Sequence, residues 1–364
     1  MMKIAHVITT ISHGGAEMQL LLLAQEQVRQ GHNVTVFPLK GSPDLANRFT
    51  AEGVSVDFSL FGVSAWKQAF RCYRCLFYHY EVVHAHLPQA EIVTRFSKFP
   101  RRFVSRHYGG QFYPGRTYLI SRVLSRFATA NCSGVIAISK FVKNNLEARK
   151  EISQAIPIHI VTYGFAPDRF VSQLSQRCRL GEERFLTVAT QKKALFTCFA
   201  RLSEEKNLSV LIRAWQKVVK VKPNYELRIY GEGPQRGRLE LLCKEIGLNP
   251  GEILPGRTSL VADVMNQSTA VVFPSLFEGF GMVLLESMSL NVPVLASRIP
   301  ICEEVMGTEG SAVFFNPTDE EELAEKIINF DQYLSRDFAT YQAKQIQKFG
   351  MRVVAERTTN IYCA

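Results

Sequence analysis

The chain has 364 residues, of which 46% are hydrophobic and 21% charged, and its formal net charge is +10. This length predicts two domains with buried cores, and the composition excludes disordered, collagen-like and low-complexity proteins. The positive charge suits an anionic partner. No nucleic-acid-binding motif accompanies that charge, so we expect no nucleic acid partner.

Neither a membrane span nor a secretory signal is expected. No apolar run reaches the ~18 to 20 residues that a bilayer crossing requires. The N-terminus lacks the apolar core and cleavage site of a signal peptide, which favours a cytoplasmic location. The eight cysteines are scattered, and a zinc site would need a second close pair beside Cys72 and Cys75. We therefore expect buried thiols and no metal.

Taken in chain order, short β-like runs alternate with helical segments, which is typical of parallel sheets covered by helices. A strand over 3–9 leads through Gly14 and Gly15 into a leucine-rich helix. Backbone amides at such a helix start can meet a phosphate, although a structural turn explains two glycines equally well. Further strands are predicted over 33–37, 54–58, 82–85, 102–105, 134–138 and 158–161. We predict a first doubly wound domain over residues 1–170.

Basic residues are concentrated in this first domain. Residues 1–170 contain 20 Lys and Arg against 10 Asp and Glu, whereas the remaining 194 residues hold 23 of each. Between Glu91 and Glu147 no acid occurs, and aromatic residues are interleaved with ten basic ones: Arg95, Lys98, Arg101, Arg102, Arg106, Arg116, Arg122, Arg126, Lys140 and Lys143. The stretch 95–143 is either a docking surface for an anionic membrane or other polyanion, or a solvated basic face.

The second half repeats the strand-and-helix pattern. Residues 171–192 are polar and weakly periodic, so we place a linker there. Strands are predicted over 196–200, 226–231, 270–273, 292–296 and 312–315, with terminal helices over 323–330 and 337–349. We predict a second domain over 193–345 and a C-terminal helix in 346–364 that crosses back to the first domain. Because ligands bind at the carboxyl ends of parallel strands, two such Rossmann-like domains would face one interdomain cleft.

Two cations follow the strand over 196–200. Arg201 and Lys206 are five positions apart, and a helix is predicted to begin with Asn207 as its N-cap. Arginine can hold a diphosphate in a bidentate manner, while lysine adds a point charge. The alternative is a surface ion pair with Glu204 or Glu205.

A turn after the strand over 270–273 carries the strongest signal. Glu278 precedes Gly279-Phe280-Gly281, whose bare backbone can approach a ligand, and a helix follows. Glu286 lies one turn after Met282, on the side of the helix that faces the turn. A carboxylate there can accept hydrogen bonds from vicinal hydroxyls, as acidic residues do when they hold ribose. The alternative is an ordinary exposed acid at each position.

Glu278 and Glu286, separated by seven residues within a Pro-Ser-x-x-Glu-Gly-Phe-Gly frame, resemble the E-x7-E motif of glycosyltransferase family 4. These are retaining, nucleotide-sugar-dependent enzymes with the two-domain GT-B fold. Residues 13–17, 31–36, 200–207 and 293–317 resemble other segments of that family. The resemblance therefore runs from about residue 3 to 330.

The resemblance implies a donor site in the second domain. Arg201 and Lys206 would hold the donor diphosphate, and Glu286 would bind the ribose. The transferred sugar would contact Glu278 and the backbone of Gly279, Phe280, Gly281, Met282 and Val283. Arg257 follows Pro255-Gly256 at a place that neighbours the base in relatives.

In the first domain, the resemblance implies that Gly14 and Gly15 let the backbone approach the donor phosphates and that His107 lies near the reacting sugar. A surface histidine in a basic stretch is the alternative for His107. Two positions depart from the family pattern: Ala200 replaces a glycine, and Tyr163-Gly164-Phe165-Ala166 stands where Asn-Gly-Val-Asp is more usual. The second departure puts the donor or acceptor contacts of this segment in doubt.

No two aspartates are two positions apart, so the metal-anchoring Asp-x-Asp pair of the other glycosyltransferase fold is missing. We therefore expect no cofactor and a metal-independent reaction in which Arg201, Lys206 and helix N-termini stabilise the leaving diphosphate. Retention of anomeric configuration is implied by resemblance alone.

The predicted function is transfer of a sugar from a UDP-, GDP- or ADP-sugar to a glycan or lipid-linked acceptor. The basic first domain favours cell-surface polysaccharide or lipopolysaccharide synthesis at the inner face of the membrane. The alternatives are a nucleotide-sugar epimerase or hydrolase on the same fold, and a silent sugar-nucleotide-binding scaffold.

Overall fold

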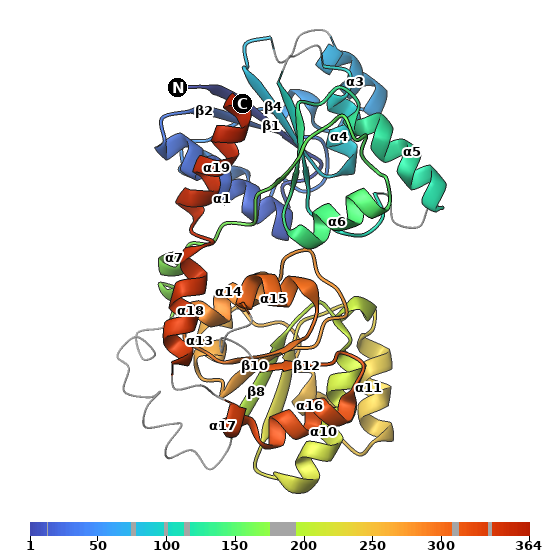
Figure 1. Ribbon diagram of the computed structural model, residues 1–364, viewed down its shortest axis with the longest axis vertical. Coiled ribbons are helices and arrows are strands. Elements are labelled where there is room, and N and C mark those ends of the chain that lie inside the picture. Colours follow the sequence, from blue (N-terminus) through green and yellow to red (C-terminus); the bar gives the residue numbers. More distant parts are fainter. Residues whose placement is uncertain are drawn as a thin grey trace. The chain divides into compact units, whose positions relative to one another are not determined.

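The computed structural model describes residues 1–12, 14–73, 78–97, 101–112, 117–174, 194–307, 313–333 and 337–364. They form two compact units (Figure 1): unit 1 comprises Met1–Gly164 and Phe349–Ala364, and unit 2 comprises Phe165–Lys348. The first segment of unit 1 thus ends at Gly164, before the boundary that we placed at residue 170. Most of the predicted linker, from residue 175 onward, lies outside the described residues.

Unit 1 is a seven-stranded parallel sheet in the order β3-β2-β1-β4-β5-β6-β7. Its strands are β1 (Lys3–Ile8), β2 (Asn33–Pro38), β3 (Ser55–Val56), β4 (Val82–His86), β5 (Arg102–Arg106), β6 (Gly134–Ala137) and β7 (Ile158–Ile160). Its helices are α1 (Gly15–Arg29), α2 (Ala46–Ala51), η1 (Phe58–Leu60), α3 (Ala65–Tyr73), α4 (Pro88–Thr94), α5 (Tyr118–Thr129), α6 (Lys140–Ala148) and α19 (Met351–Cys363).

The predicted strand over 54–58 is shorter than expected. Only Ser55 and Val56 pair with β2, because a 3-10 turn starts at Phe58. The Asp57 side chain caps this turn by accepting a hydrogen bond from the Ser59 backbone N–H at 2.7 Å. A local side-chain acceptor therefore ends the strand.

Both faces of the unit 1 sheet are buried, as expected of parallel strands that read as continuous apolar runs. Ile4 and Ile8 of β1 share one core with α1 and α19, whereas Ala5 and Val7 share another with α3 and α4. The C-terminal helix α19 packs on α1 and buries Tyr362. The last segment of the chain is thus part of unit 1.

Unit 2 is a five-stranded parallel sheet in the order β12-β11-β10-β8-β9. Its strands are β8 (Leu195–Phe199), β9 (Glu226–Tyr230), β10 (Ala270–Phe273), β11 (Val294–Ser297) and β12 (Val313–Phe315). Its helices are α7 (Pro167–Val171), η2 (Glu204–Lys206), α10 (Leu208–Val221), α11 (Arg236–Glu245), α12 (Pro250–Ile253), α13 (Val261–Asn266), α14 (Met282–Ser289), α15 (Pro300–Met306), α16 (Glu320–Ile328), α17 (Phe330–Tyr333) and α18 (Phe338–Gln347).

Both strand orders reverse direction once, at β1 and β4 in unit 1 and at β8 and β10 in unit 2. In doubly wound sheets, the loops at the carboxyl ends of such strands diverge and leave a crevice for ligands. The topology therefore directs attention to the loops after β8 and β10. Among the described helices, none has the length and apolar character needed to cross a membrane.

Candidate active site

The loops after β8 and β10 bring together residues that lie far apart in the sequence. Lys206, at the end of η2, forms an ion pair with the Glu278 carboxylate, and the Ser275 hydroxyl donates to the same carboxylate at 3.2 Å. The alternative that pairs Lys206 with Glu204 or Glu205 is therefore wrong. The two charges offset each other at the point where a charged ligand would arrive.

Asn207 ties the two loops to each other. It occupies the N-cap position of α10, as predicted, with a left-handed backbone (φ 54°, ψ 34°). Its side chain does not cap the helix, and donates instead to the carbonyl oxygens of Pro274 at 3.2 Å and Pro317 at 2.7 Å. The Leu276 N–H adds a bond to the Glu205 carbonyl at 2.9 Å. These bonds fix the loops after β8 and β10 to each other.

The Gly279-Phe280-Gly281 turn leads directly into α14. Gly281 is the N-cap residue with φ 82°, a conformation that L side chains rarely adopt. Phe280 is buried, so its ring anchors the turn to the interior of unit 2. A ligand at this turn would therefore meet backbone, as the motif predicts.

Glu286 lies on α14, and its carboxyl is removed from water. The residue is half-buried, and loss of contact with water raises the pKa of its carboxyl to about 7. Within the described part of the chain, this carboxyl has neither a hydrogen bond nor an ion pair. A carboxylate removed from water without a protein partner is costly, and donors from a ligand would compensate it.

Beside these loops lies an open hollow of ≈ 550 Å³, within the size range of small-molecule sites. The structure places Arg201 and Arg257 together in its wall, with the stacked rings of Phe199 and Tyr230 (centroids 5.4 Å apart). Lys206, Glu278 and Glu286 do not line it. The remaining lining residues are Ala200, Gly231, Glu232, Gly233, Thr258 and Val261.

Sequence reasoning missed Tyr230 and its neighbours, although a signal was present. A side chain at Gly231 or Gly233 would collide with backbone, because its Cβ would lie 1.8 Å from the Ala200 carbonyl oxygen or 2.4 Å from that of Leu202. Glycines that follow a strand closely in this way mark a place where two backbones meet at the sheet edge.

In unit 1, the predicted phosphate-approach site is already occupied by an acid. Gly14 is the N-cap of α1, and the Glu17 carboxylate lies against it, accepting from the Thr10 hydroxyl at 2.6 Å. The negative charge of Glu17 complements the helix dipole at this end. His13, which precedes these glycines, is outside the described residues.

His107 follows β5, and both of its ring nitrogens are engaged within unit 1. Nδ1 is hydrogen-bonded to the Tyr163 hydroxyl at 2.8 Å, and Nε2 to His86 Nδ1 at 3.2 Å. Burial lowers the pKa of His107 to about 4. His107 is therefore a neutral imidazole at physiological pH.

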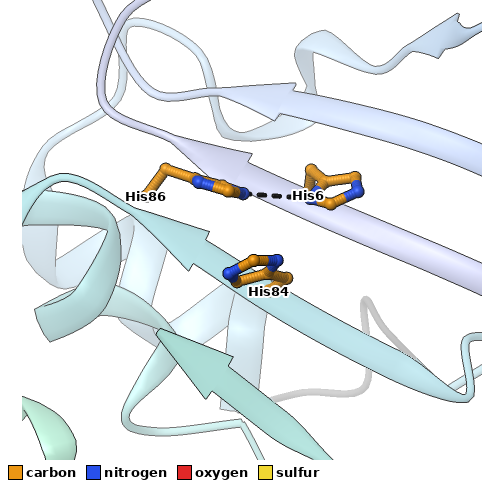
Figure 2. Close-up of side chains that lie close together, drawn as sticks. All are labelled: His6, His84 and His86. Atoms are coloured by element: carbon orange, nitrogen blue, oxygen red, sulfur yellow. Dashed lines mark hydrogen bonds between the residues drawn. The ribbon is translucent and has the colours of Figure 1, made fainter. Parts of the chain in front are cut away.

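A buried histidine cluster surrounds His86 and was not predicted. His6 on β1 pairs directly with His84 on β4, and His86 lies two residues further on the same face (Figure 2). Nitrogens of the three rings all lie within 4.8 Å of one another. The sequence did contain a signal for this cluster: His84 and His86 are two positions apart in a strand, and alternate strand residues share a face.

The predicted docking stretch 95–143 needs a correction. Arg102 and Arg106 are buried, with 2% and 5% exposure, and Arg106 forms ion pairs with Glu91 at 2.9 Å and Glu151 at 3.8 Å. These two arginines belong to the interior and cannot dock on a membrane. Lys98 and Arg116 lie outside the described residues.

The helix α5 lies within this stretch, and its polarity is inverted. The side chains on its inward face are small: the buried residues are Ser121, Ser125, Ala128 and Thr129. Its outward face exposes large apolar side chains, namely Tyr118, Leu119, Ile120, Val123 and Phe127. An ordinary surface helix buries its apolar face, whereas α5 turns its large apolar side chains outward.

Comparisons with known proteins agree with this architecture. Residues 13–169 match the family model Glycosyltransferase Family 4, and residues 181–344 match Glycosyl transferases group 1. Together the two matches cover most of the chain, which belongs to the family 4 glycosyltransferases, enzymes of the GT-B type. The predicted fold class, GT-B with two doubly wound parallel-sheet domains, is confirmed.

Individual relatives are distant. The chain is 26% identical to an uncharacterized glycosyltransferase of Methanocaldococcus jannaschii, over 63% of this chain and 59% of that relative. It is 23% identical to a phosphatidylinositol N-acetylglucosaminyltransferase subunit of Saccharomyces cerevisiae, over 96% of this chain and 79% of the subunit. The Anabaena HepE protein, solved with UDP and glucose, has the same fold with a TM-score of 0.80, 19% identity and 99% of both chains covered.

Proposed function

We propose that this glycosyltransferase moves a sugar from a nucleoside diphosphate sugar to a glycan or lipid-linked acceptor, with retention of configuration and without a metal. Two observations in unit 2 carry the proposal: a Glu286 carboxyl that has no partner among the described residues, and a hollow lined by Arg201 and Arg257. Such a carboxyl suits the hydroxyls of a ribose, and the arginines suit phosphate oxygens.

Each part of the donor has a matching group in unit 2. Arg201 and Lys206 would hold the diphosphate, while Glu278 and the turn before α14 would hold the transferred sugar. The stacked rings in the hollow offer a flat apolar wall for the base. UDP-glucose is the first donor to test, because the Anabaena protein of the same fold was solved with UDP and glucose.

The transfer step then needs no added ion. The bond from the anomeric carbon to the diphosphate oxygen breaks, and a bond to the acceptor oxygen forms on the same face. The acceptor hydroxyl proton passes to the departing diphosphate, whose charge Arg201 and Lys206 stabilise. Because both His107 nitrogens are already hydrogen-bonded, we assign His107 no proton transfer; the family resemblance alone implies a position near the sugar.

For the acceptor side, we propose that α5 lies against an anionic membrane face at the inside of the cell. Leu119 and Val123 are 67% and 64% exposed, and Arg122 and Arg126 lie on the same helix. Apolar side chains that enter the acyl boundary and arginines that meet acidic headgroups are the two components of such docking. A lipid-linked acceptor would then be presented to unit 1 from that face.

The donor assignment is tested by thermal stabilisation with UDP, GDP, ADP and their sugar conjugates, with a chelator present. A nucleotide at 100 times its Kd adds about 2.7 kcal/mol, a shift of several degrees. We expect one base to stabilise the protein selectively, and Glu286→Ala to abolish the shift while the exposed Glu245→Gln control keeps it. No shift with any nucleotide would refute the donor site and favour a silent scaffold.

Donor turnover with and without acceptor separates the transferase from its alternatives. A transferase releases nucleoside diphosphate in proportion to the glycosylated acceptor. Equal release without any acceptor would indicate a hydrolase, and isomerised donor would indicate an epimerase.

Membrane docking is tested by sedimentation with anionic and neutral vesicles. We expect binding to anionic vesicles only, reduced by high salt, by Leu119→Ser with Val123→Ser and by Arg122→Ala with Arg126→Ala. The matched control changes two exposed basic residues of α10, Arg213→Ala with Lys220→Ala. Binding that none of the α5 changes reduces would refute this surface.

A further inference from the structure

A continuous line of hydrogen bonds crosses one of the two buried faces of the unit 1 sheet. It links the Tyr163 hydroxyl to His107 Nδ1 (2.8 Å), His107 Nε2 to His86 Nδ1 (3.2 Å), His86 Nε2 to His6 Nδ1 (3.0 Å) and His6 Nε2 to Gln27 Oε1 (2.8 Å). These five residues come from β1, α1, β4, and the segments after β5 and β7. We call them the histidine chain.

The acceptor at the Gln27 end decides which atom donates and which accepts in every hydrogen bond of the histidine chain. Burial lowers the pKa of His6 and His107 to about 4, and that of His86 well below its usual range, so each ring is neutral with one donor and one acceptor. The Gln27 carbonyl oxygen can only accept, so His6 Nε2 donates to it. His86 Nε2 must then donate to His6, and His107 Nε2 to His86. His107 Nδ1 is left to accept from the Tyr163 hydroxyl.

The hydrogen-bond partners of these rings also argue against a metal in this cluster. His84 completes the trio of Figure 2, but its Nδ1 is hydrogen-bonded to the Tyr362 hydroxyl at 2.5 Å and its Nε2 to Ser105 Oγ at 2.8 Å. His6 and His86 already bond to each other. All the ring nitrogens of the trio are therefore used within the protein, and a metal would have to displace these bonds.

The open end of the histidine chain lies where unit 1 gives way to unit 2. Tyr163 precedes Gly164, the last residue of unit 1 in this region, and the Gly164 N–H donates to Gln19 Oε1 of α1 at 3.0 Å. Tyr163 also stands where asparagine is more usual in the family, and its hydroxyl is hydrogen-bonded to His107. The charged group that faces Tyr163 from α1 is Glu17, while His84 and Tyr362 face the middle of the histidine chain.

We propose that Tyr163 is a positioning residue for sugar transfer: its hydroxyl starts a directed histidine chain that fixes the His107 ring as the Nε2–H tautomer and anchors the segment joining the two units. This role rests on the proposed function, because its kinetic consequence appears only in the transfer reaction. The tautomer itself is a property of the free protein.

Nitrogen-15 NMR of histidine-labelled protein tests the tautomers without any substrate. We expect His6, His86 and His107 to be neutral Nε2–H tautomers from pH 5.5 to 8, with slowly exchanging ring protons, and the exposed His79 supplies a reference signal. Nδ1–H tautomers, or rings that take up a second proton in this range, would overturn the proposal. So would visible d–d bands of tetrahedral Co²⁺ bound stoichiometrically at this cluster.

Tyr163→Phe removes only the hydroxyl that starts the histidine chain. We expect faster exchange of the His107 ring proton and loss of its single tautomer, and a kcat about 5- to 10-fold lower with an unchanged donor KM, as one lost hydrogen bond implies. Tyr80→Phe is the control, because that half-buried tyrosine of unit 1 lies outside the histidine chain.

The NMR measurement and the kinetic measurement test different parts of the proposal. An unchanged His107 tautomer in Tyr163→Phe would overturn the histidine chain, and an unchanged kcat beside an altered tautomer would overturn the positioning role. If the wild-type protein transferred no sugar, the proposed function would fail while the NMR result still decided the tautomers.

Discussion

Unit 1 and unit 2 share a doubly wound parallel sheet but treat their polar groups differently. In unit 1, Arg106 is enclosed with Glu91 and Glu151, and the histidine chain satisfies its rings internally. In unit 2, Arg201 and Arg257 line an open hollow and the Glu286 carboxyl has no partner in the part of the chain that the structure describes.

The difference teaches how to separate a structural polar group from a ligand-binding one on a shared fold. Removing one member of a buried ion pair leaves the other charge buried without a partner, which destabilises the fold. A desolvated group left without a partner is stabilised when a ligand supplies one. Variants in the two units should therefore fail in different assays.

The largest effect is expected from Arg106→Ala in unit 1. Removing this cation leaves buried Glu91 and Glu151 without their partner, which costs about 3–5 kcal/mol of unfolding free energy. Burial already raises the pKa of Glu91 to about 7. The loss should therefore be smaller at pH 5, where the Glu91 carboxyl is protonated, than at pH 8. Denaturant unfolding measures it, with the exposed Arg29→Ala as control; an equal loss at both pH values would contradict the ion-pair explanation.

Arg201→Ala in unit 2 should instead leave unfolding nearly unchanged and lower kcat/KM for transfer by roughly 100- to 1000-fold, the cost of one missing transition-state donor. Initial rates over a donor series measure this, and the exposed Arg213→Ala should behave like the wild type. A large loss of stability in Arg201→Ala would erase the distinction between the two units.

Glu286→Gln should weaken nucleotide binding by roughly 10- to 100-fold, because hydrogen bonds to a charged acceptor contribute about 1.5–3 kcal/mol. The change keeps the size of the side chain and removes its charge. Calorimetry with the free nucleotide measures the affinity, against Glu245→Gln on the surface of α11. Tighter nucleotide binding in Glu286→Gln would contradict a ribose-binding role.

The smallest effect is a pH dependence. The folded pKa of Glu286, about 7, lies above its ordinary value of 4.5, so the folded state binds the proton more tightly. Its contribution to stability should therefore fall as pH rises from about 4.5 to 7, and Glu286→Gln should remove that dependence.

Ribose hydroxyls favour the charged carboxylate, so nucleotide binding at pH 7 should release a fraction of a proton. Calorimetry in buffers of different ionisation enthalpy measures that release. Proton uptake would show that the ligand accepts from a protonated Glu286.

Much of the architecture was predictable because strands and helix starts are local properties. The strand predicted over 270–273 is β10, and the helix predicted to begin after Asn207 is α10. The signals used were apolar runs of strand length, glycines at turns, and two glutamates eight positions apart. Each of these signals is contained within a few consecutive residues. The donor-site motif is likewise contained in one turn and one helix.

The sequence by itself determined the fold class, the family and the segment that carries the candidate donor site. Only the tertiary structure decided that Lys206 pairs with Glu278, that Arg106 is interior and that Tyr163 begins a line of histidines ending at Gln27. These contacts join residues from different strands and helices. Burial and partner choice depend on which side chains packing brings together, and no local pattern encodes that.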